Sequence, residues 1–453
     1  WPVGGLTPYN RVTRHQLGPH ALRRDLILLD EHTGTQFDAP AHFVPPPDSG
    51  LEGAGPMGLV TSEKVPVWQF VGEACVIDIR DHVDDARPGE SFLITPEMVQ
   101  EWERKHRPLG PGDIVLFRSD YSDKYYQPFP AGRRFVESAL ANETPGWPGP
   151  TPSCMKYLGE RKVTAAGIDS ASMGPLPNLA VATHQAGGQY GLIWAECLTG
   201  LGQLPATGGL YAILPVKHAG GSGGEARAIG IPDPKVAAPL LAAAKAKRVV
   251  DLSVLLDEDL PITWPGDKPG TEGTRYLGKT LNKFDPNYGP FFARTHTLDS
   301  HVGTHLVPPA CALPADGHDV KYSPEVTKVR EEYEKKFGAR GFSSQTAEQV
   351  PLDQLAGRLR LIDVRKLAGT TAEKDWPASP AITIDAVKAY EQATQPIASG
   401  DVVVFLTGYT DAHFKKLPEG KRLLVDPLAG KAEAWPAPDA TVIAYLADHG
   451  VRC

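Results

Sequence analysis

The feature that most constrains the fold is that the sequence repeats itself. The stretch HTGTQFDAPAHF, which begins at His32, returns as HVGTHLVPPACA from His301. Two further blocks return in the same order: GDIVLFRSDYSDKYY as GDVVVFLTGYTDAHF, and GWPGPTPSCMKYLGER as AWPAPDATVIAYLADH. Because blocks at a nearly constant spacing specify the same core twice, the chain is predicted to be a tandem duplication.

The predicted domain bounds follow from this repeat. Residues 1–230 form the first copy, residues 231–250 a linker rich in Pro, Ala and Lys, and residues 251–453 the second copy. The segment Arg248–Leu256, RVVDLSVLL, is predicted to be the opening strand of the second copy, and the first copy has no counterpart of it. The second copy is expected to be incomplete at its C-terminus, with the remainder supplied by a longer polypeptide or by a complementing chain.

Short apolar runs rich in β-branched residues predict buried strands in the first copy. They cover residues 74–79, 113–119, 163–170 and 211–216. Residues 95–106 predict a helix, because a Thr at the N-cap precedes a Pro and apolar residues then recur at helical spacing. Residues 383–393 repeat this helix in the second copy. Each copy is therefore predicted to be an α/β domain, a sheet with helices packed against it.

The segment EHTGTQFDAPAHF groups side chains that bind metals. In an extended segment alternate side chains share a face. This places four polar residues together: His32, Gln36, Asp38 and His42. Imidazole and carboxylate are the ligands that Zn²⁺ or Mn²⁺ would take from such a segment. The alternative is that both histidines are satisfied loop residues and that Asp38 caps a turn.

Composition limits the class of protein. The chain has 453 residues, of which 41% are hydrophobic and 22% charged, as in an ordinary globular protein. It has no apolar run long enough to cross a membrane, and its net charge of −8, without a basic cluster, argues against nucleic acid as a partner. The five cysteines are far apart and odd in number, which predicts reduced thiols and a cytoplasmic location.

The motif resembles the signature of the metal-dependent cyclase-like hydrolases, the family of bacterial kynurenine formamidase and isatin hydrolase. That signature reads His-x-Gly-Thr-His-x-Asp-x-Pro-x-His. The blocks GDIVLFRSDYSDKYY, GIDSAS, ATHQAGGQYGLIWAECLTGLGQLP and LPVKHAGGSGGEARAIGI follow in the family's order. The resemblance covers nearly all of the first copy and much of the second. It implies two tandem cyclase-like domains of a swivelling β/β/α type.

The resemblance also implies a divalent-metal site, with Zn or Mn, in the first copy. The family's metal ligands fall on His32, Gln36, Asp38, His184 and Glu196, and its catalytic histidine falls on His42. The sequence departs from the family at Gln36, where an amide replaces imidazole. An amide oxygen is a weaker ligand for Zn²⁺ and is better tolerated by a harder ion such as Mn²⁺. For His184 and Glu196 the alternative is a buried polar pair beside a helix.

The second copy departs further from the family pattern. It keeps His301 and His305 but has Val307 in place of the carboxylate ligand and Cys311 in place of the catalytic histidine. We interpret this as a degenerate site, with Val307 in an apolar pocket and Cys311 reduced and at least partly buried. The alternative is a zinc site built from two imidazoles and a thiolate.

The expected function is hydrolysis of a small molecule at a non-peptide amide, a cyclic amide, or an ester or lactone. A metal-activated water would attack the carbonyl, and His42 would serve as general base and acid. The alternatives are a catalytically silent binding or scaffold protein, a subunit of a larger assembly, and a dehydrative ring-closing cyclase. Family members resemble dimers whose subunits wall each other's pockets. The fused copies are therefore expected to form an intramolecular pseudo-dimer, with a further homo-oligomer or a complementing chain as partner.

Overall fold

The computed structural model describes residues 8–264 and 276–453. The chain forms two compact units that are interleaved in sequence. The first unit comprises Trp1–Asn10, Leu28–Leu255 and Gly278–His296, and the second comprises Arg11–Ile27, Leu256–Leu277 and Thr297–Cys453. The predicted second copy therefore contributes residues 278–296 to the first unit. The linear domain bounds stay a prediction.

A closed barrel of seven strands organises the first unit. Its order is β10-β11-β3-β9-β8-β6-β4. The strands are β3 (Gln36–Asp38), β4 (Val71–Asp78), β6 (Asp113–Arg118), β8 (Ala165–Ile168), β9 (Ile193–Glu196), β10 (Gly209–Pro215) and β11 (Gly223–Ile231). Strands β4, β6, β8 and β9 run parallel, whereas β10, β11 and β3 join the barrel through antiparallel pairs. The four predicted strands are confirmed as β4, β6, β8 and β10.

Alternation along the strands separates two cores. In β6, Ile114 and Leu116 belong to the cluster inside the barrel, while Val115 and Phe117 belong to the cluster on its outer face. Successive side chains of a strand point to opposite faces, so a continuous apolar run can serve both cores. This is why the middle of β6 has no polar residue.

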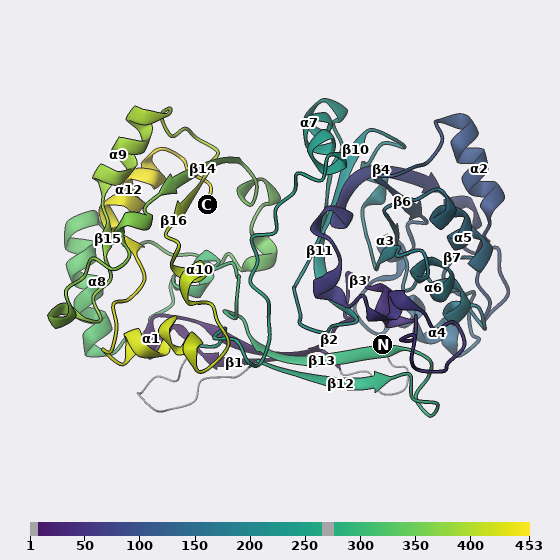
Figure 1. The fold of residues 1–453 in the computed structure, drawn as a ribbon, viewed down its shortest axis with the longest axis horizontal. Coiled ribbons are helices and arrows are strands. Elements are labelled where there is room, and N and C mark those ends of the chain that lie inside the picture. The colour runs from purple at the N-terminus through teal and green to yellow at the C-terminus, as the bar shows by residue number, and fades with distance from the viewer. Residues whose placement is uncertain (1–7, 265–275) are drawn as a thin grey trace. The chain divides into compact units, whose positions relative to one another are not determined.

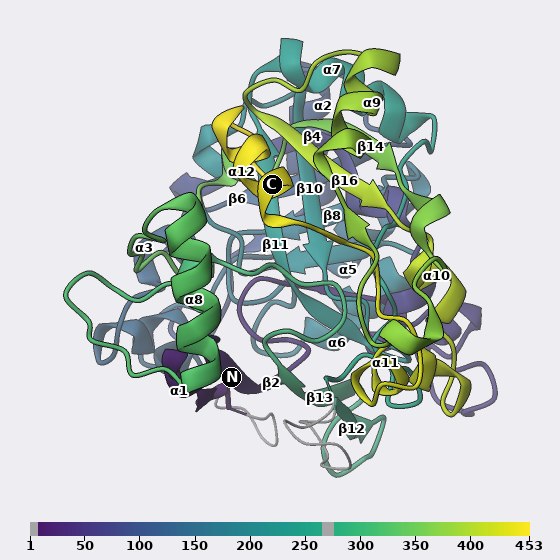
Figure 2. The ribbon, with the colours of Figure 1, turned by 90° about the vertical axis from the view of Figure 1, so that its left-hand side faces the viewer.

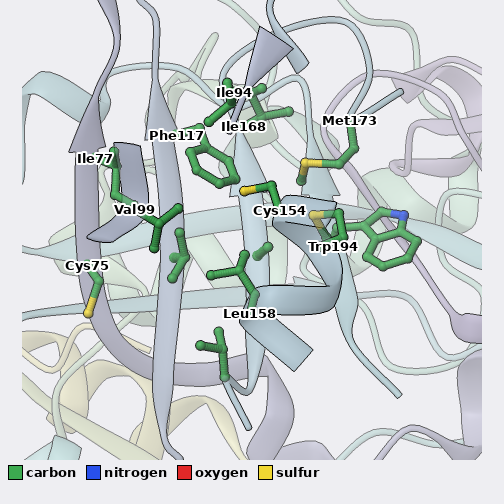
Figure 3. Packing of buried hydrophobic residues seen from close by; sticks show 14 of the residues in the cluster. Cys75, Ile77, Ile94, Val99, Phe117, Cys154, Leu158, Ile168, Met173 and Trp194 are labelled. Carbon is green, nitrogen blue, oxygen red and sulfur yellow. The ribbon is translucent and has the colours of Figure 1, made fainter. Parts of the chain in front are cut away.

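Helices cover the outer face of the barrel. The helices of the first unit are α2 (Pro96–Lys105), α3 (Tyr121–Tyr125), α4 (Glu137–Leu140), α5 (Pro152–Glu160), α6 (Ala180–Gly188) and α7 (Pro234–Lys245). Figure 1 shows α2, α5 and α6 along one side of the barrel strands. Their apolar side chains meet those of the strands in the cluster of Figure 3, where Leu158 of α5 lies among residues such as Phe117 and Trp194. The predicted helix at residues 95–106 is confirmed as α2.

The second unit has a smaller sheet. Strands β14 (Arg358–Asp363) and β16 (Asp401–Leu406) pair in parallel. The unit's helices are α1 (Leu17–His20), α8 (Pro324–Phe337), α9 (Ile384–Ala393), α10 (Tyr409–His413), α11 (Val425–Leu428) and α12 (Ala440–Asp448). Figure 2 shows α9 and α12 beside these two strands, and their apolar residues share one core. The helix predicted at residues 383–393 is confirmed as α9.

Three small sheets complete the fold. Strands β5 (Leu93–Ile94) and β7 (Gly149–Pro150) pair in the first unit, and β15 (Ala381–Ile382) and β17 (Ala437–Pro438) pair in the second. A four-stranded sheet has the order β1-β2-β13-β12. Its strands are β1 (Asn10–His15), β2 (Arg24–Asp30), β12 (Leu277–Lys283) and β13 (Phe292–Asp299), and the bounds of the two units pass through them.

The two units repeat individual side-chain contacts as well as elements. The hydroxyl of Tyr121 accepts a hydrogen bond from Arg134 at 2.7 Å, and the hydroxyl of Tyr409 accepts one from Arg422 at 2.6 Å. The motif segments also share a local form, because each ends in a 3₁₀ turn, at Pro40–His42 and Pro309–Cys311. These correspondences agree with the predicted duplication.

The strand predicted at Arg248–Leu256 is wrong. Within this segment, Leu256 forms an isolated β-bridge and the other residues have no strand structure. Val250 and Leu252 are 75% and 77% exposed. The contacts of Asp251 explain why this segment does not form the predicted strand. Its carboxylate accepts the backbone N–H of Ser253 at 2.9 Å and binds Lys217 at 2.9 Å. Such local side-chain bonds to the backbone compete with a strand ladder.

None of the helices in the described part of the chain is long and apolar enough to cross a membrane.

The outer-face core predicts a clear stability contrast. Replacing fully buried Leu158 by alanine should lower the free energy of unfolding by about 2 to 5 kcal/mol, because the cavity removes dispersion contacts as well as buried area. Leu59→Ala, at a side chain that is 51% exposed, should change it by less than about 0.5 kcal/mol. Denaturant unfolding followed by circular dichroism measures both. Equal effects would contradict the assignment of this core.

Candidate metal centre

The candidate site lies on the outer face of the barrel, where β3 and β9 pair. Phe37 of β3 and Ala195 of β9 point into the barrel core. Alternation therefore directs Gln36 and Asp38, and likewise Glu196, to the opposite face. The antiparallel register places Gln36 directly across from Glu196. Gln36 and Glu196, which are far apart in the sequence, therefore lie side by side because their strands pair.

Helix α6 brings the remaining predicted ligand to this face. His184 lies in the middle of α6 and is buried. The helix can approach β9 closely because residue 187 is glycine, and a Cβ there would collide with the ring of Trp194. That ring in turn donates its indole N–H to Asp38 Oδ2 at 2.9 Å. The packing of α6 and the position of Asp38 are therefore coupled.

Asp38 is the centre of the cluster. Its Oδ1 lies 2.9 Å from His32 Nδ1. Its Oδ2 lies 3.6 Å from His184 Nε2 and 3.8 Å from His42 Nε2. The structure therefore brings three of the predicted histidines to one buried carboxylate. Their roles as ligands or catalyst stay predictions.

Glu196 is the second carboxylate of the cluster. Its Oε1 lies 3.3 Å from His184 Nε2 and accepts the backbone N–H of Met173 at 2.7 Å and the hydroxyl of Ser172 at 3.1 Å. Its Oε2 accepts the side-chain amide of Gln36 at 2.9 Å. The carboxylate is therefore fixed in orientation by donors from several segments.

The amide nitrogen of Gln36 makes a hydrogen bond, whereas its side-chain oxygen makes none to the described residues. The nitrogen donates to Glu196, while Oε1 is buried and meets no hydrogen-bond partner among the described residues. A buried polar atom without a partner is costly unless something binds it. A cation in the site would satisfy this oxygen, which fits the predicted role of Gln36 as a ligand.

The hydrogen bonds of two histidines define which ring nitrogen is available. His184 Nδ1 lies 2.6 Å from the carbonyl of Ala180, and His42 Nδ1 lies 2.5 Å from the carbonyl of Phe292. A carbonyl can only accept, so Nδ1 carries the proton in both rings. In the neutral rings Nε2 then keeps its lone pair, and both Nε2 atoms face Asp38. A histidine that ligates a metal typically bonds its other nitrogen in this way.

The charges in the cluster are strongly coupled. Burial opposes ionisation of Asp38, but the surrounding imidazoles, His42 and His32 foremost, hold its pKa well below the usual range. Burial also opposes the charge on His32, yet the charge and hydrogen bond of Asp38 raise the pKa of His32 to about 9. Burial and the neighbouring His32 lower the pKa of His42 to about 3. His42 is therefore neutral near pH 7.

The hydrogen bond between His32 and Asp38 indicates which proton a bound cation would replace. The hydroxyl of Ser222 donates to Glu31 at 2.5 Å, so His32 Nε2, 2.9 Å from that hydroxyl oxygen, acts as a donor to it. His32 Nδ1 then faces Asp38 Oδ1 across 2.9 Å, and the two atoms share a proton. A divalent ion is able to replace that proton, which is how metal binding commonly couples to deprotonation of ligands.

The donor set fits a divalent ion. Ligand atoms of Asp38, His184 and Glu196 lie within 4.8 Å of one another, and so do those of His32, Asp38 and His42. Two carboxylates, imidazoles with available nitrogens and one unpaired amide oxygen are the groups that Zn²⁺ or Mn²⁺ takes. The residues present therefore suit the predicted metal.

Several residues around the site were not predicted from the sequence. Glu31 is fully buried and accepts the hydroxyl of Ser222, and it lies 2.8 Å from His296 Nε2. Phe43 and Phe291 place their rings 4.2 Å from His184 and 6.1 Å from His42. Glu31 and Phe43 had a signal, because they are the first and last residues of the segment EHTGTQFDAPAHF.

The corresponding segment of the second unit differs. The prediction that Val307 lies in an apolar pocket is wrong, because its side chain is 49% exposed. In the first unit β3 is held between β11 and β9, whereas residues 305–308 form no strand in the described part of the second unit. Cys311 is buried and is a free thiol, as predicted.

Comparison with known proteins places the chain in a family. The model of a family described as putative cyclase matches residues 7–175 and 250–453. The matched segments span more than half of the chain, so the chain belongs to the putative cyclase family and is an enzyme of it. This confirms the resemblance found in the sequence, and the two matched segments agree with a duplication.

Individual relatives match about half of the chain. Isatin hydrolase of Roseibium aggregatum is 29% identical over 217 residues, which are 45% of this chain and 73% of that protein. Isatin hydrolase A from Labrenzia aggregata, bound to benzyl benzoate, is 25% identical with a TM-score of 0.42, over 51% of this chain and 90% of its own. Isatin hydrolase A from Ralstonia solanacearum is 26% identical with a TM-score of 0.42, over 50% of this chain and 83% of its own.

The unpaired oxygen of Gln36 yields a test of its role. Gln36→His should tighten Zn²⁺ binding by about tenfold or more, because imidazole is the better zinc ligand. Gln127→His, at an exposed glutamine outside the site, should leave affinity unchanged. Titration with a fluorescent zinc competitor measures both. Weaker or unchanged binding in Gln36→His would mean that Gln36 serves to hold Glu196 instead of the ion.

Proposed function

We propose that the protein is a metal-dependent hydrolase that cleaves a non-peptide amide, a cyclic amide, or an ester or lactone of a small molecule. The observation that carries the proposal is the convergence of buried His, Asp and Glu side chains from β3, α6 and β9 around Asp38. The relatives named isatin hydrolases support a hydrolytic reaction and a small-molecule substrate.

Five residues would hold the ion: His32, Gln36, Asp38, His184 and Glu196. A divalent ion bound there would make a water more acidic and would polarise a carbonyl group. The harder donors in this set, two carboxylates and an amide oxygen, favour Mn²⁺ alongside Zn²⁺.

His42 is the proposed proton carrier. Its Nδ1–H is bound to the carbonyl of Phe292, so the lone pair of Nε2 faces the site 3.8 Å from Asp38 Oδ2. Its lowered pKa keeps the ring neutral near pH 7, so Nε2 is unprotonated before the reaction. His42 takes a proton from the attacking water and then delivers it to the leaving nitrogen or oxygen.

The surroundings of His42 hold it in position. Its ring stacks on His32 with centroids 3.8 Å apart, and Phe43 meets it edge-on at 4.4 Å. Apolar rings beside the reacting groups keep water away and strengthen the electrostatic interactions inside the site. The backbone of β13 adds the remaining contact, through the Phe292 carbonyl.

The rival function is that of a silent binding protein, in which Gln36 has weakened the metal site. The buried Gln36 oxygen, which has no hydrogen-bond partner among the described residues, supports a bound cation and so favours the metal-dependent hydrolase. Ring closure by dehydration would use the same groups in the reverse direction. The substrate on which turnover is observed distinguishes ring closure from hydrolysis.

A substitution at His42 tests the proposed mechanism. His42→Gln should retain the metal but lower turnover by about 10²-fold or more, because the amide cannot carry a proton. His82→Gln, at an exposed histidine paired with Asp85, should leave turnover unchanged. The assay would use protein loaded with Mn²⁺ or Zn²⁺ and a panel of isatin, formyl-anilines, lactams and lactones. Full activity in His42→Gln would assign the base elsewhere, and loss of the metal would make His42 a ligand.

A further inference from the structure

A cavity of about 490 Å³ in the first unit lies at the amino ends of the parallel barrel strands. Its lining includes Val71, the first residue of β4, and Gly112 and Thr164, which directly precede β6 and β8. It also includes Gly191, two residues before β9. The predicted metal ligand Glu196 is the last residue of β9. The cavity and this ligand are therefore at opposite ends of the strand.

Basic groups outnumber acidic groups in the lining of this cavity. Lys162, Lys245 and Lys247 contribute three ammonium groups, against the single carboxylate of Glu160. That carboxylate is paired at 3.7 Å with Lys156, which is outside the lining. Among the described residues, no carboxylate lies within ion-pairing distance of the three lining lysines. The cavity therefore carries an excess of positive charge, which favours an anionic ligand.

Two of these lysines are held in place by specific contacts. The ammonium of Lys247 lies over the ring of Trp68, 4.2 Å from its centroid. The aliphatic part of Lys245 lies along Gly112, where an added Cβ would be 3.4 Å from its Cγ. A free lysine side chain loses rotamer freedom when it binds a ligand, which weakens binding. The contacts with Trp68 and Gly112 reduce this loss because they restrict the lysines in advance.

Aromatic and apolar side chains form another part of the wall. Trp68, Tyr190, Val71 and Val163 line the cavity. The ring of Tyr190 lies against Gly159, where a Cβ would collide with it, yet the side chain stays 46% exposed. Sites for small molecules typically combine such walls with a few polar groups, at volumes of about 300 to 1,000 Å³. The cavity is therefore suited to a ring that carries an anionic group.

We propose that this cavity is a second ligand site, apart from the metal centre, which binds small aromatic carboxylates. The carboxylate accepts hydrogen bonds from the ammonium groups of Lys245 and Lys247, and the ring contacts Trp68 and Tyr190. Binding is noncovalent. An anion without a ring would leave the aromatic wall unused, and a ring without a charge would leave the lysines unpaired.

Isothermal titration calorimetry of the full chain with naphthoate tests the proposal. Naphthoate should bind with a Kd below about 1 mM, as a ligand of this size can in a preformed site. Naphthamide has the ring without the charge, and acetate has the charge without the ring. Each should bind at least about tenfold more weakly than naphthoate, because each lacks one half of the recognised group.

Paired variants locate the binding. The double variant Lys245→Gln with Lys247→Gln should weaken naphthoate binding by about tenfold or more, because both charged donors are lost. A matched double variant, Lys105→Gln with Lys235→Gln, changes two exposed helix lysines outside the cavity and should keep the parent affinity. Circular dichroism checks that both variants are folded.

Four results would overturn the proposal. The first is the absence of saturable naphthoate binding by the parent up to about 10 mM. The second is unchanged affinity in the cavity variant, which binding at the metal centre would give. The third is an equal loss in both double variants, which would indicate attraction by overall charge. The fourth is inorganic phosphate that binds as tightly as naphthoate and is lost in the cavity variant, which would make the cavity a phosphate site.

Discussion

The site depends on one buried carboxylate, that of Asp38. A carboxylate removed from water is stable only if positive charge and hydrogen bonds replace its hydration. His32, Trp194 and His184 provide these contacts, at 2.9, 2.9 and 3.6 Å. Trp194 is placed by the pairing of β9 with β3 and His184 by the packing of α6, whereas His32 lies in the turn before β3. The fold of the first unit is therefore what makes the charge of Asp38 tolerable, and the same arrangement groups donor atoms that could hold a cation.

The two occurrences of the motif share part of their backbone form and differ in their chemistry. In both copies an aspartate accepts the backbone N–H of the first motif histidine, Asp30 from His32 at 2.8 Å and Asp299 from His301 at 2.9 Å. The side chains that follow then differ. In the first copy imidazoles surround a carboxylate. In the second copy the thiol of Cys311 lies beside the imidazole of His301. The second copy also contributes β12 and β13 residues to the first unit, among them Phe292, which fixes the proton of His42.

The repeated blocks, the main strands and helices, and the grouping of His32, Asp38 and His42 could be predicted from the sequence, because hydrophobic periodicity and motif spacing are local signals. Joining His184 and Glu196 to them required the family resemblance. The Phe292 carbonyl could not be predicted, since a backbone group has no signature in the sequence. The exposure of Val307 could not be predicted either, because it depends on which strands pair beside it. At Arg248–Leu256 the apolar pattern was correct but the local bonds of Asp251 prevailed.

The most direct test of the account is the metal content of the full chain. Protein stripped with a chelator, reloaded with Mn²⁺ or Zn²⁺ and dialysed should retain about one tightly bound ion per chain by elemental analysis. Asp38→Asn should abolish this binding, because the central carboxylate loses its charge. Asp120→Asn, in a separate acidic group, should retain it. Retention below about 0.2 ions per chain in the parent, or equal retention in Asp38→Asn, would contradict a metal centre at Asp38.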